Sequence, residues 1–196
     1  MTAPLLQISD LSCHRDGREL FAQLNLTLES GECVEVRGPN GSGKSTLLRC
    51  VAGVYMDYQG SIEVAPSLYA GHKLGLSPLL SAAENLQWYA GIIADGGNVG
   101  SISVALGRVG MAGYEDVACR NMSAGQQRRV ALARMLVGGR SLWLLDEPLT
   151  ALDADGQSLV RDLMAEQLAG GGAVLCATHQ NLDVAGSRQL TLGETT

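Results

Sequence analysis

The chain has 196 residues, the size of one domain with room for a small inserted subdomain. Hydrophobic residues make up 46% and charged residues 17%, a balance that supplies a packed core and excludes global disorder. The net charge of −6 argues against a nucleic-acid-binding protein, because such proteins carry a basic face.

Two kinds of segment are not predicted. The least charged region, residues 74–107, carries only Glu84 and Asp95, but Gly, Ser and Asn interrupt it, so it is not expected to span a membrane. Residues 1–10 have no basic stretch followed by an apolar run, so no secretion signal is expected.

The five cysteines form no CxxC pair, which predicts reduced, buried thiols in the cytoplasm.

Short apolar runs alternate with helical patterns along the chain, which predicts an α/β domain. The runs at 142–145 and 173–177 contain no polar residue, as in parallel strands that are buried on both faces. The predicted strands are 5–11, 20–28, 33–37, 142–145 and 173–177, and the predicted helices are 44–52, 81–93, 99–109, 126–137 and 155–168.

A glycine-rich segment follows the third predicted strand. Residues 38–45 match the P-loop pattern GxxxxGK[ST] at every fixed position, and a predicted helix follows. Its glycines let backbone N–H groups converge on phosphate oxygens. Lys44 is expected to reach the β- and γ-phosphates of ATP, Ser45 to bind Mg²⁺, and Thr46 to contact the α-phosphate side. The predicted phosphate-binding residues are Gly38, Pro39, Asn40, Gly41, Ser42, Gly43, Lys44, Ser45 and Thr46.

The apolar strand at 142–145 leads directly into two acids, Asp146 and Glu147. A carboxylate at a strand end beside a P-loop holds Mg²⁺, and we assign that role to Asp146. Glu147 is then placed to orient and deprotonate the attacking water. An acidic pair alone is more often a solvated loop, but its place after a buried strand in a chain with a P-loop indicates hydrolysis of ATP.

Three further motifs make the chain resemble the ATP-binding-cassette family. Residues 121–129, NMSAGQQRR, resemble the LSGGQ signature, residues 149–153 resemble the D-loop, and Thr178-His179 resembles the segment of the switch histidine. The resemblance implies one nucleotide-binding domain over 1–196. Its expected fold is an α/β P-loop core with an antiparallel β subdomain and an inserted helical subdomain at about 74–138.

The resemblance also implies a second phosphate-binding element. Ser123 and Gly125 are expected to open a helix, so that their N–H groups and the hydroxyl face a phosphate. In the family this element closes on the γ-phosphate held by the other subunit, which implies a homodimer joined by ATP. His179 is expected to sense the γ-phosphate and to act in catalysis with Glu147 and Lys44. The residues expected at this second element are Ser123, Ala124, Gly125, Gln126 and Asp153.

Within that family the chain is similar to the haem-exporter ATP-binding subunits of cytochrome c maturation. Those subunits share two departures from most cassettes: His72 stands where others have Gln, and Arg15 stands near the place of an aromatic ring that stacks on adenine. Arg15 is therefore expected to contact adenine with weak selectivity for ATP over GTP. His72 is expected to couple the nucleotide state of this chain to the position of its membrane partner. The similar segments are 68–72, 84–86, 123–134, 142–148, 151–153 and 178–182.

The resemblance implies membrane partners and no nucleic-acid partner. The expected partners are an integral membrane permease subunit and other cytochrome c maturation proteins, at the cytoplasmic face of the bacterial inner membrane. Trp88 and Tyr89 are expected either in the core or in a groove that receives a partner's helix.

Several alternatives remain open. An ATPase subunit of another exporter, for lipoproteins, lipids or drugs, shares every catalytic motif, although His72 and Arg15 argue against it. A soluble cassette acting on DNA or ribosomes normally has a coiled coil, a second cassette or a basic surface. A binding module without hydrolysis is expected to lack Glu147 or His179, and a GTPase is expected to carry an NKxD motif. Export of haem and release of a haem-loaded carrier predict the same sequence here.

Overall fold

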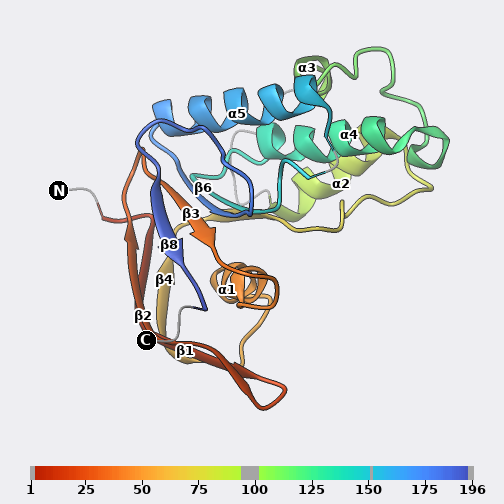
Figure 1. Ribbon diagram of the computed structural model, residues 1–196. Helices are drawn as coiled ribbons and strands as arrows, with labels where there is room; N and C mark the ends of the chain where they lie inside the picture. The colour runs from red at the N-terminus through yellow and green to blue at the C-terminus, as the bar shows by residue number, and fades with distance from the viewer. Residues whose placement is uncertain (1–2, 94–101, 151, 194–196) are drawn as a thin grey trace. The chain divides into compact units, whose positions relative to one another are not determined.

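The computed structural model describes residues 3–93, 102–150 and 152–193 (Figure 1). The predicted helix 99–109 starts outside the described residues, and Ala151 of the predicted D-loop also lies outside them. Among the described residues, none of the helices combines the length and apolarity needed to cross a membrane. The chain divides into two compact units, the first made of 1–72, 141–150 and 160–196, and the second of 73–140 and 151–159.

The first unit contains an antiparallel sheet in the order β2-β1-β4, formed by β1 (Leu6–Arg15), β2 (Arg18–Leu28) and β4 (Gln59–Val64). β1 extends four residues beyond the predicted end, because the turn at Asp16 and Gly17 lets the ladder continue to its tip. Both turn residues have positive φ, 52° and 74°, as a two-residue hairpin turn requires. β4 was not predicted, since only one of its six residues is even partly buried.

The first unit also contains a parallel sheet, whose strand order is β5-β6-β7-β3-β8. Its three inner strands agree with the predicted strands, and β6 and β7 are buried at every residue. The two edge strands were not predicted, because each is four residues long and has no clear apolar pattern. The strands are β3 (Cys33–Arg37), β5 (Ser67–Ala70), β6 (Leu142–Asp146), β7 (Ala173–Ala177) and β8 (Arg188–Thr191). These two sheets confirm the α/β class.

Helix α1 (Lys44–Val51) shares one core with the strands of both sheets (Figure 1). Leu47 and Leu48 of this helix are fully buried, together with Leu11 of β1 and Leu144 of β6. All five cysteines are buried and unpaired, as predicted. Burial raises the pKa of the Cys33 thiol to about 12, so it stays protonated and unreactive near neutral pH.

The second unit is helical. Its elements are α2 (Ala82–Ile93), α3 (Ile102–Arg108), the short 3₁₀ helix η1 (Cys119–Asn121), α4 (Ala124–Val137) and the start of α5 (Ala154–Ala169). α2 begins with a reciprocal capping pair, since the N–H of Ser81 donates to Glu84 (2.7 Å) and the N–H of Glu84 donates to Ser81 (3.2 Å). The predicted division into one nucleotide-binding domain with an inserted helical subdomain at about 74–138 stays a prediction.

Asn85 organises the loop that precedes α2. Its side chain is 4% exposed, and its Oδ1 accepts from the N–H of Ser77 at 2.7 Å. Its Nδ2 lies within hydrogen-bonding distance of the carbonyl oxygens of Ser77 (3.0 Å), Leu80 (3.2 Å) and Ser81 (2.9 Å). The carbonyl oxygens of Leu80 and Ser81 also accept backbone N–H bonds from Cys119 and Asn85, so the buried amide matters most for the N–H and carbonyl oxygen of Ser77.

We predict that Asn85→Ala destabilises the protein by about 2 kcal/mol, because it removes the side-chain partner of both backbone groups of Ser77 and empties a buried site. The measurement is thermal or denaturant unfolding. Gln87→Ala, on an exposed position of the same helix, is the matched control and is expected to change stability by less than about 0.5 kcal/mol. Equal effects of the two substitutions would contradict the role given to Asn85.

Candidate active site

The site is built at the carboxyl ends of three adjacent strands. β3, β6 and β7 are parallel neighbours, so the residues that follow them meet at one edge of the sheet. Gly38 follows β3, Glu147 follows β6, and Thr178-His179 follows β7. The topology thus brings together three motifs that are far apart in the sequence.

The P-loop glycines adopt backbone conformations that side chains disfavour. Gly38, Gly41 and Gly43 have φ of 143°, 81° and 98°. A Cβ atom at Gly38 would collide with the carbonyl oxygen of Leu192, and one at Gly43 would lie 3.0 Å from the Cβ of Leu20. The loop is therefore closed in against its neighbours in a shape that only glycine permits.

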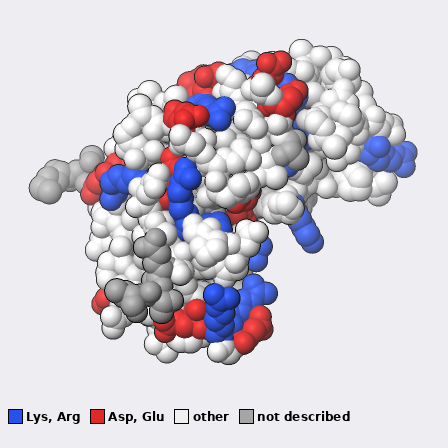
Figure 2. Space-filling view, viewed as in Figure 1, with Lys and Arg blue, Asp and Glu red and all other residues white. Residues whose placement is uncertain are grey.

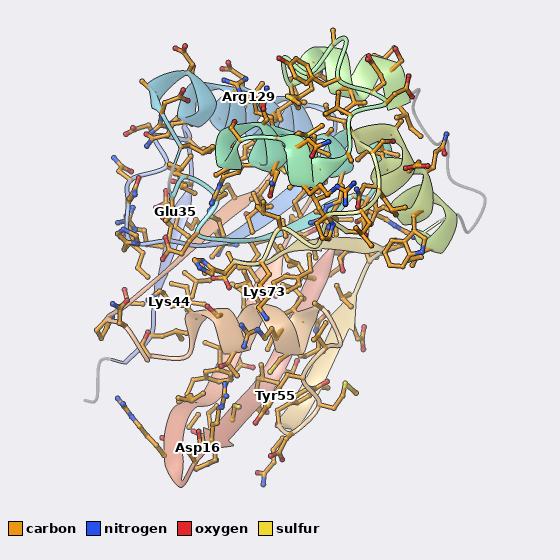
Figure 3. All side chains as sticks on the ribbon, turned by 90° about the vertical axis from the view of Figure 1, so that its right-hand side faces the viewer. Asp16, Glu35, Lys44, Tyr55, Lys73 and Arg129 are labelled. Atoms are coloured by element: carbon orange, nitrogen blue, oxygen red, sulfur yellow. The ribbon has the colours of Figure 1, made fainter. Side chains whose placement is uncertain are left out.

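The loop leads into an uncapped helix end. Gly43 is the N-cap of α1 and supplies no side-chain hydrogen bond, so N–H groups of the first turn remain to bind an anion. Lys44, 8% exposed, folds back over the loop, and its Nζ donates to the carbonyl oxygens of Gly38 (2.8 Å) and Pro39 (3.0 Å). Figure 3 shows Lys44 at the start of α1. An ammonium beside open N–H groups is suited to a phosphate.

Ser45 and Asp146 form a pair of hard oxygen donors. The Ser45 hydroxyl donates to Oδ1 of Asp146 at 2.9 Å, and Asp146 is 5% exposed at the end of β6. A hydroxyl and one carboxylate fit Mg²⁺, which prefers oxygen ligands and takes its remaining ligands from water and phosphate. The two residues assigned to the metal thus lie in direct contact.

Glu147 and His179 also touch. Oε2 of Glu147 lies 2.8 Å from Nδ1 of His179, and the Glu147 N–H donates to the carbonyl oxygen of Ala177 at 2.8 Å. Glu147 has φ of 53°, a conformation that non-glycine residues seldom adopt and that occurs at functional sites. The backbone therefore holds this carboxylate at the sheet edge, where it is 22% exposed.

A cavity of about 520 Å³ opens beside these groups. Four of its side chains are cationic and two are acidic, so it is suited to a polyanion. Sequence reasoning found Arg15 but missed Arg18 and Arg49. Arg18 is the residue opposite Arg15 in the register of the hairpin. Arg49 lies four residues after Ser45, and this spacing could have placed it on the same face of the helix. The cavity is lined by Arg15, Asp16, Arg18, Leu20, Asn40, Gly41, Gly43, Lys44, Ser45, Thr46, Arg49 and Glu147.

The residues predicted for a second phosphate site lie in the second unit. Ser123 is the N-cap of α4, where its Oγ accepts from the N–H of Gln126 (3.2 Å) and its own N–H donates to the Gln126 side chain (2.9 Å). Ala124 and Gly125 are exposed in the first turn. Asp153 caps the next helix by accepting from the N–H of Gly156 at 2.8 Å. Gln126 and Asp153 therefore have local structural roles, and their nucleotide contacts stay predictions.

The model of the ABC transporter family matches residues 21–150, which include the P-loop and the acidic strand end. The chain belongs to the ABC transporter family. It is also 42% identical to the cytochrome c biogenesis ATP-binding export protein CcmA of Pseudomonas syringae, over 97% of this chain and 96% of that protein. The protein of the same name from Aliivibrio fischeri is 42% identical over 97% of this chain and all of its own length.

Solved ABC structures share the fold. An inward-facing putative metal-chelate type ABC transporter aligns with a TM-score of 0.82 and 27% identity, over 97% of this chain and 80% of that chain. The ATP-binding cassette MJ0796, in a dimeric post-hydrolysis state with ADP and Pi, aligns with a TM-score of 0.81 and 23% identity, over 95% and 94%. The predicted P-loop fold of the ABC type is confirmed.

We predict that Glu147→Gln keeps ATP binding but lowers hydrolysis by 10²–10⁴-fold, as expected when a general base is lost. The measurement is steady-state ATPase activity together with nucleotide binding. Glu63→Gln makes the same chemical change at an exposed position of β4 and is the control with unchanged activity. Hydrolysis by Glu147→Gln within about threefold of the unmodified protein would contradict the assignment.

Proposed function

We propose that the chain is the ATP-hydrolysing subunit of a membrane transporter for cytochrome c biogenesis, which drives haem export or release of a haem carrier. The proposal rests on the P-loop, the acidic strand end and His179, which lie together at one edge of the sheet. The chain that carries them is 42% identical, over 97% of its length, to an ATP-binding export protein of that process. A subunit of another exporter is the second candidate, since the catalytic contacts would be the same.

The reaction proposed is in-line attack of water on the γ-phosphate. Lys44 and the N–H groups at the start of α1 stabilise charge on the phosphates. Glu147 orients the water and takes its proton, while His179, 2.8 Å from Glu147, contacts the γ-phosphate. Ser45 and Asp146 hold Mg²⁺, which when bound neutralises charge on the phosphate oxygens. Each role matches a group that the fold brings to the same edge.

A dimer joined by ATP is the proposed working state. Ser123, Ala124 and Gly125 are exposed at the N-terminus of α4, where N–H groups and the positive helix end favour an anion. The Ser123 hydroxyl accepts a hydrogen bond within its own helix, which leaves its proton to donate to a phosphate. A second copy would provide that phosphate.

The partner is proposed to dock on α2. A cavity of about 410 Å³ lies beside this helix, lined by Gly75, Leu76, Ser77, Leu80, Asn85 and Trp88. Trp88 is 63% exposed and Leu79 is 71% exposed, and exposed apolar side chains beside a pocket mark interfaces. Tyr89 lies instead under Arg134, 5.3 Å from ring centre to guanidinium. A permease subunit at the cytoplasmic face of the bacterial inner membrane would supply a helix that docks here. His72, which is exposed, would couple the nucleotide state of this chain to the position of that subunit.

Surface charge is consistent with a partner other than nucleic acid. On the face shown in Figure 2, groups of Lys and Arg atoms and groups of Asp and Glu atoms are both scattered among uncharged atoms. A nucleic-acid partner would require a concentrated positive surface to displace counterions.

We predict that Trp88→Asp prevents co-purification with the membrane subunit, because an unpaired charge in an apolar interface costs several kcal/mol. Gln87→Asp adds the same charge at the neighbouring exposed position and is expected to leave co-purification intact. Quantitative pull-down from detergent extract, with ATPase activity of the isolated chain as a folding check, measures the difference. Normal assembly of Trp88→Asp would place the docking surface elsewhere.

We predict that ATP and GTP bind within about 1 kcal/mol of each other, because none of the described residues that line the 520 Å³ cavity has an aromatic ring. Stacking on such a ring contributes roughly 1–3 kcal/mol per base. Competition binding measures the ratio. Arg15→Tyr, which supplies a ring at the hairpin, is expected to tighten nucleotide binding, and a hundredfold preference for ATP in the unmodified chain would contradict the prediction.

A further inference from the structure

The segment that carries His179 is an unusual crossover. β7 and β8 run parallel to each other on opposite sides of β3, so the chain between them must pass across β3. Such connections normally contain a helix and a dozen or more residues. Here residues 178–187 make the connection without a helix, and His179 is its second residue. Contacts other than helix packing must therefore hold this segment in place.

β3 supplies those contacts from one of its faces. Val34 and Val36 belong to the apolar core that contains α1. Because side chains alternate along a strand, Glu35 and Arg37 lie on the opposite face. Glu35, labelled in Figure 3, is 1% exposed although it is an acid. A carboxylate is buried in this way only when charged and polar groups satisfy it.

The Glu35 carboxylate binds both Arg37 and the far end of the crossover. Its Oε2 accepts from Nε (3.0 Å) and Nη2 (2.5 Å) of Arg37. Its Oε1 accepts from the hydroxyl of Ser187 at 2.8 Å, directly before β8 begins. Both carboxylate oxygens of Glu35 thus accept hydrogen bonds, one from Arg37 and the other from the end of the crossover.

Arg37 in turn binds the residue next to the switch histidine. Its Nη2 donates to the carbonyl oxygen of Gln180 at 3.0 Å. On the other side of His179, the N–H of Thr178 donates to the carbonyl oxygen of Val36 (3.2 Å), and the Thr178 hydroxyl accepts from the N–H of Gln180 (3.0 Å). Both neighbours of His179 are therefore anchored to β3, while its own side chain, 59% exposed, reaches Glu147.

We propose that Glu35 and Arg37 form a positioning pair that holds His179 against Glu147, an inference that rests on the proposed role of His179 in hydrolysis. The guanidinium fixes the carbonyl of Gln180, and Glu35 fixes the guanidinium. Neither side chain lines the nucleotide cavity, so the pair acts through the backbone of the crossover. Displacement of a catalytic side chain by about 1 Å lowers turnover by up to about 100-fold.

The decisive variant replaces both charges at once. Arg37→Met alone would leave Glu35 buried without its cation and could unfold the chain, whereas two apolar side chains in place of a buried pair are often neutral for stability. The double variant Glu35→Met/Arg37→Met removes the guanidinium bond to the Gln180 carbonyl oxygen, leaves the bond that the Thr178 hydroxyl donates to it at 3.2 Å, and roughly keeps side-chain volume. Arg188→Met is the matched control, because the Arg188 guanidinium binds Glu32 (2.9 Å) and the carbonyl oxygen of Thr27 (2.8 Å) rather than the crossover.

We expect the double variant of the full-length chain to bind ATP within about threefold of the unmodified protein while its kcat falls by about 10- to 100-fold. Arg188→Met is expected to keep both values. In a His179→Ala background the same double variant should lower kcat by less than about twofold more, because residues that act through one group are not additive. A merely structural role would instead lower kcat equally in both backgrounds.

Two results would overturn the positioning role. One is a folded double variant with kcat within about threefold of the unmodified protein, and the other is an equal loss with and without His179. If the double variant does not fold, Arg37→Lys decides by the same measurements, since it keeps a cation beside Glu35 but cannot also reach Gln180 through a fixed fork. Unchanged hydrolysis by His179→Ala would instead overturn the proposed function of His179 itself.

Discussion

The burial of helix α1 between two sheets is the constraint on which the site depends. The helix has eight residues, too few to be stable alone in water, so packing must hold it. Leu47 and Leu48 are fully buried in a core that includes strands of the antiparallel and the parallel sheet. Because the apolar side chains fix the helix, its polar N-terminus is presented at a set place with N–H groups that no side chain caps. Phosphate binding therefore begins with apolar packing.

Three buried charged side chains of the first unit, those of Glu35, Lys44 and Asp146, each meet a specific partner. Lys44 donates to two P-loop carbonyls, Asp146 accepts from Ser45, and Glu35 binds Arg37. Isolated charges at such depths would cost several kcal/mol each, so every one is held by a specific contact. These contacts all involve residues in or near β3 and β6, the strands whose carboxyl ends lead into the proposed catalytic site.

The second unit holds exposed apolar side chains next to a loop that hydrogen bonds fix in place. Asn85 ties down the loop before α2 through buried hydrogen bonds, and Ser81 with Glu84 caps the helix. Three residues after Asn85, Trp88 stands 63% exposed beside a cavity. Exposed apolar side chains on a fixed backbone lose little conformational entropy when a partner binds, which is the physical basis of the docking proposed for this helix.

The sequence by itself determined the α/β class, the inner strands of the parallel sheet, the P-loop, the acidic strand end and His179. These features are local: fixed spacing, glycine content and continuous apolar runs carry them. Tertiary structure alone decided the edge strands β5 and β8, which are short and have no apolar period of their own. It also decided the place of Arg18 and Arg49 in the cavity and the buried amide network of Asn85. Arg37 meets Gln180 across 143 positions, and Glu35 meets Ser187 across 152. No local pattern encodes such contacts. They form only because the sheet order places β8 beside β3, so that the crossover from β7 to β8 passes over the side chains of β3.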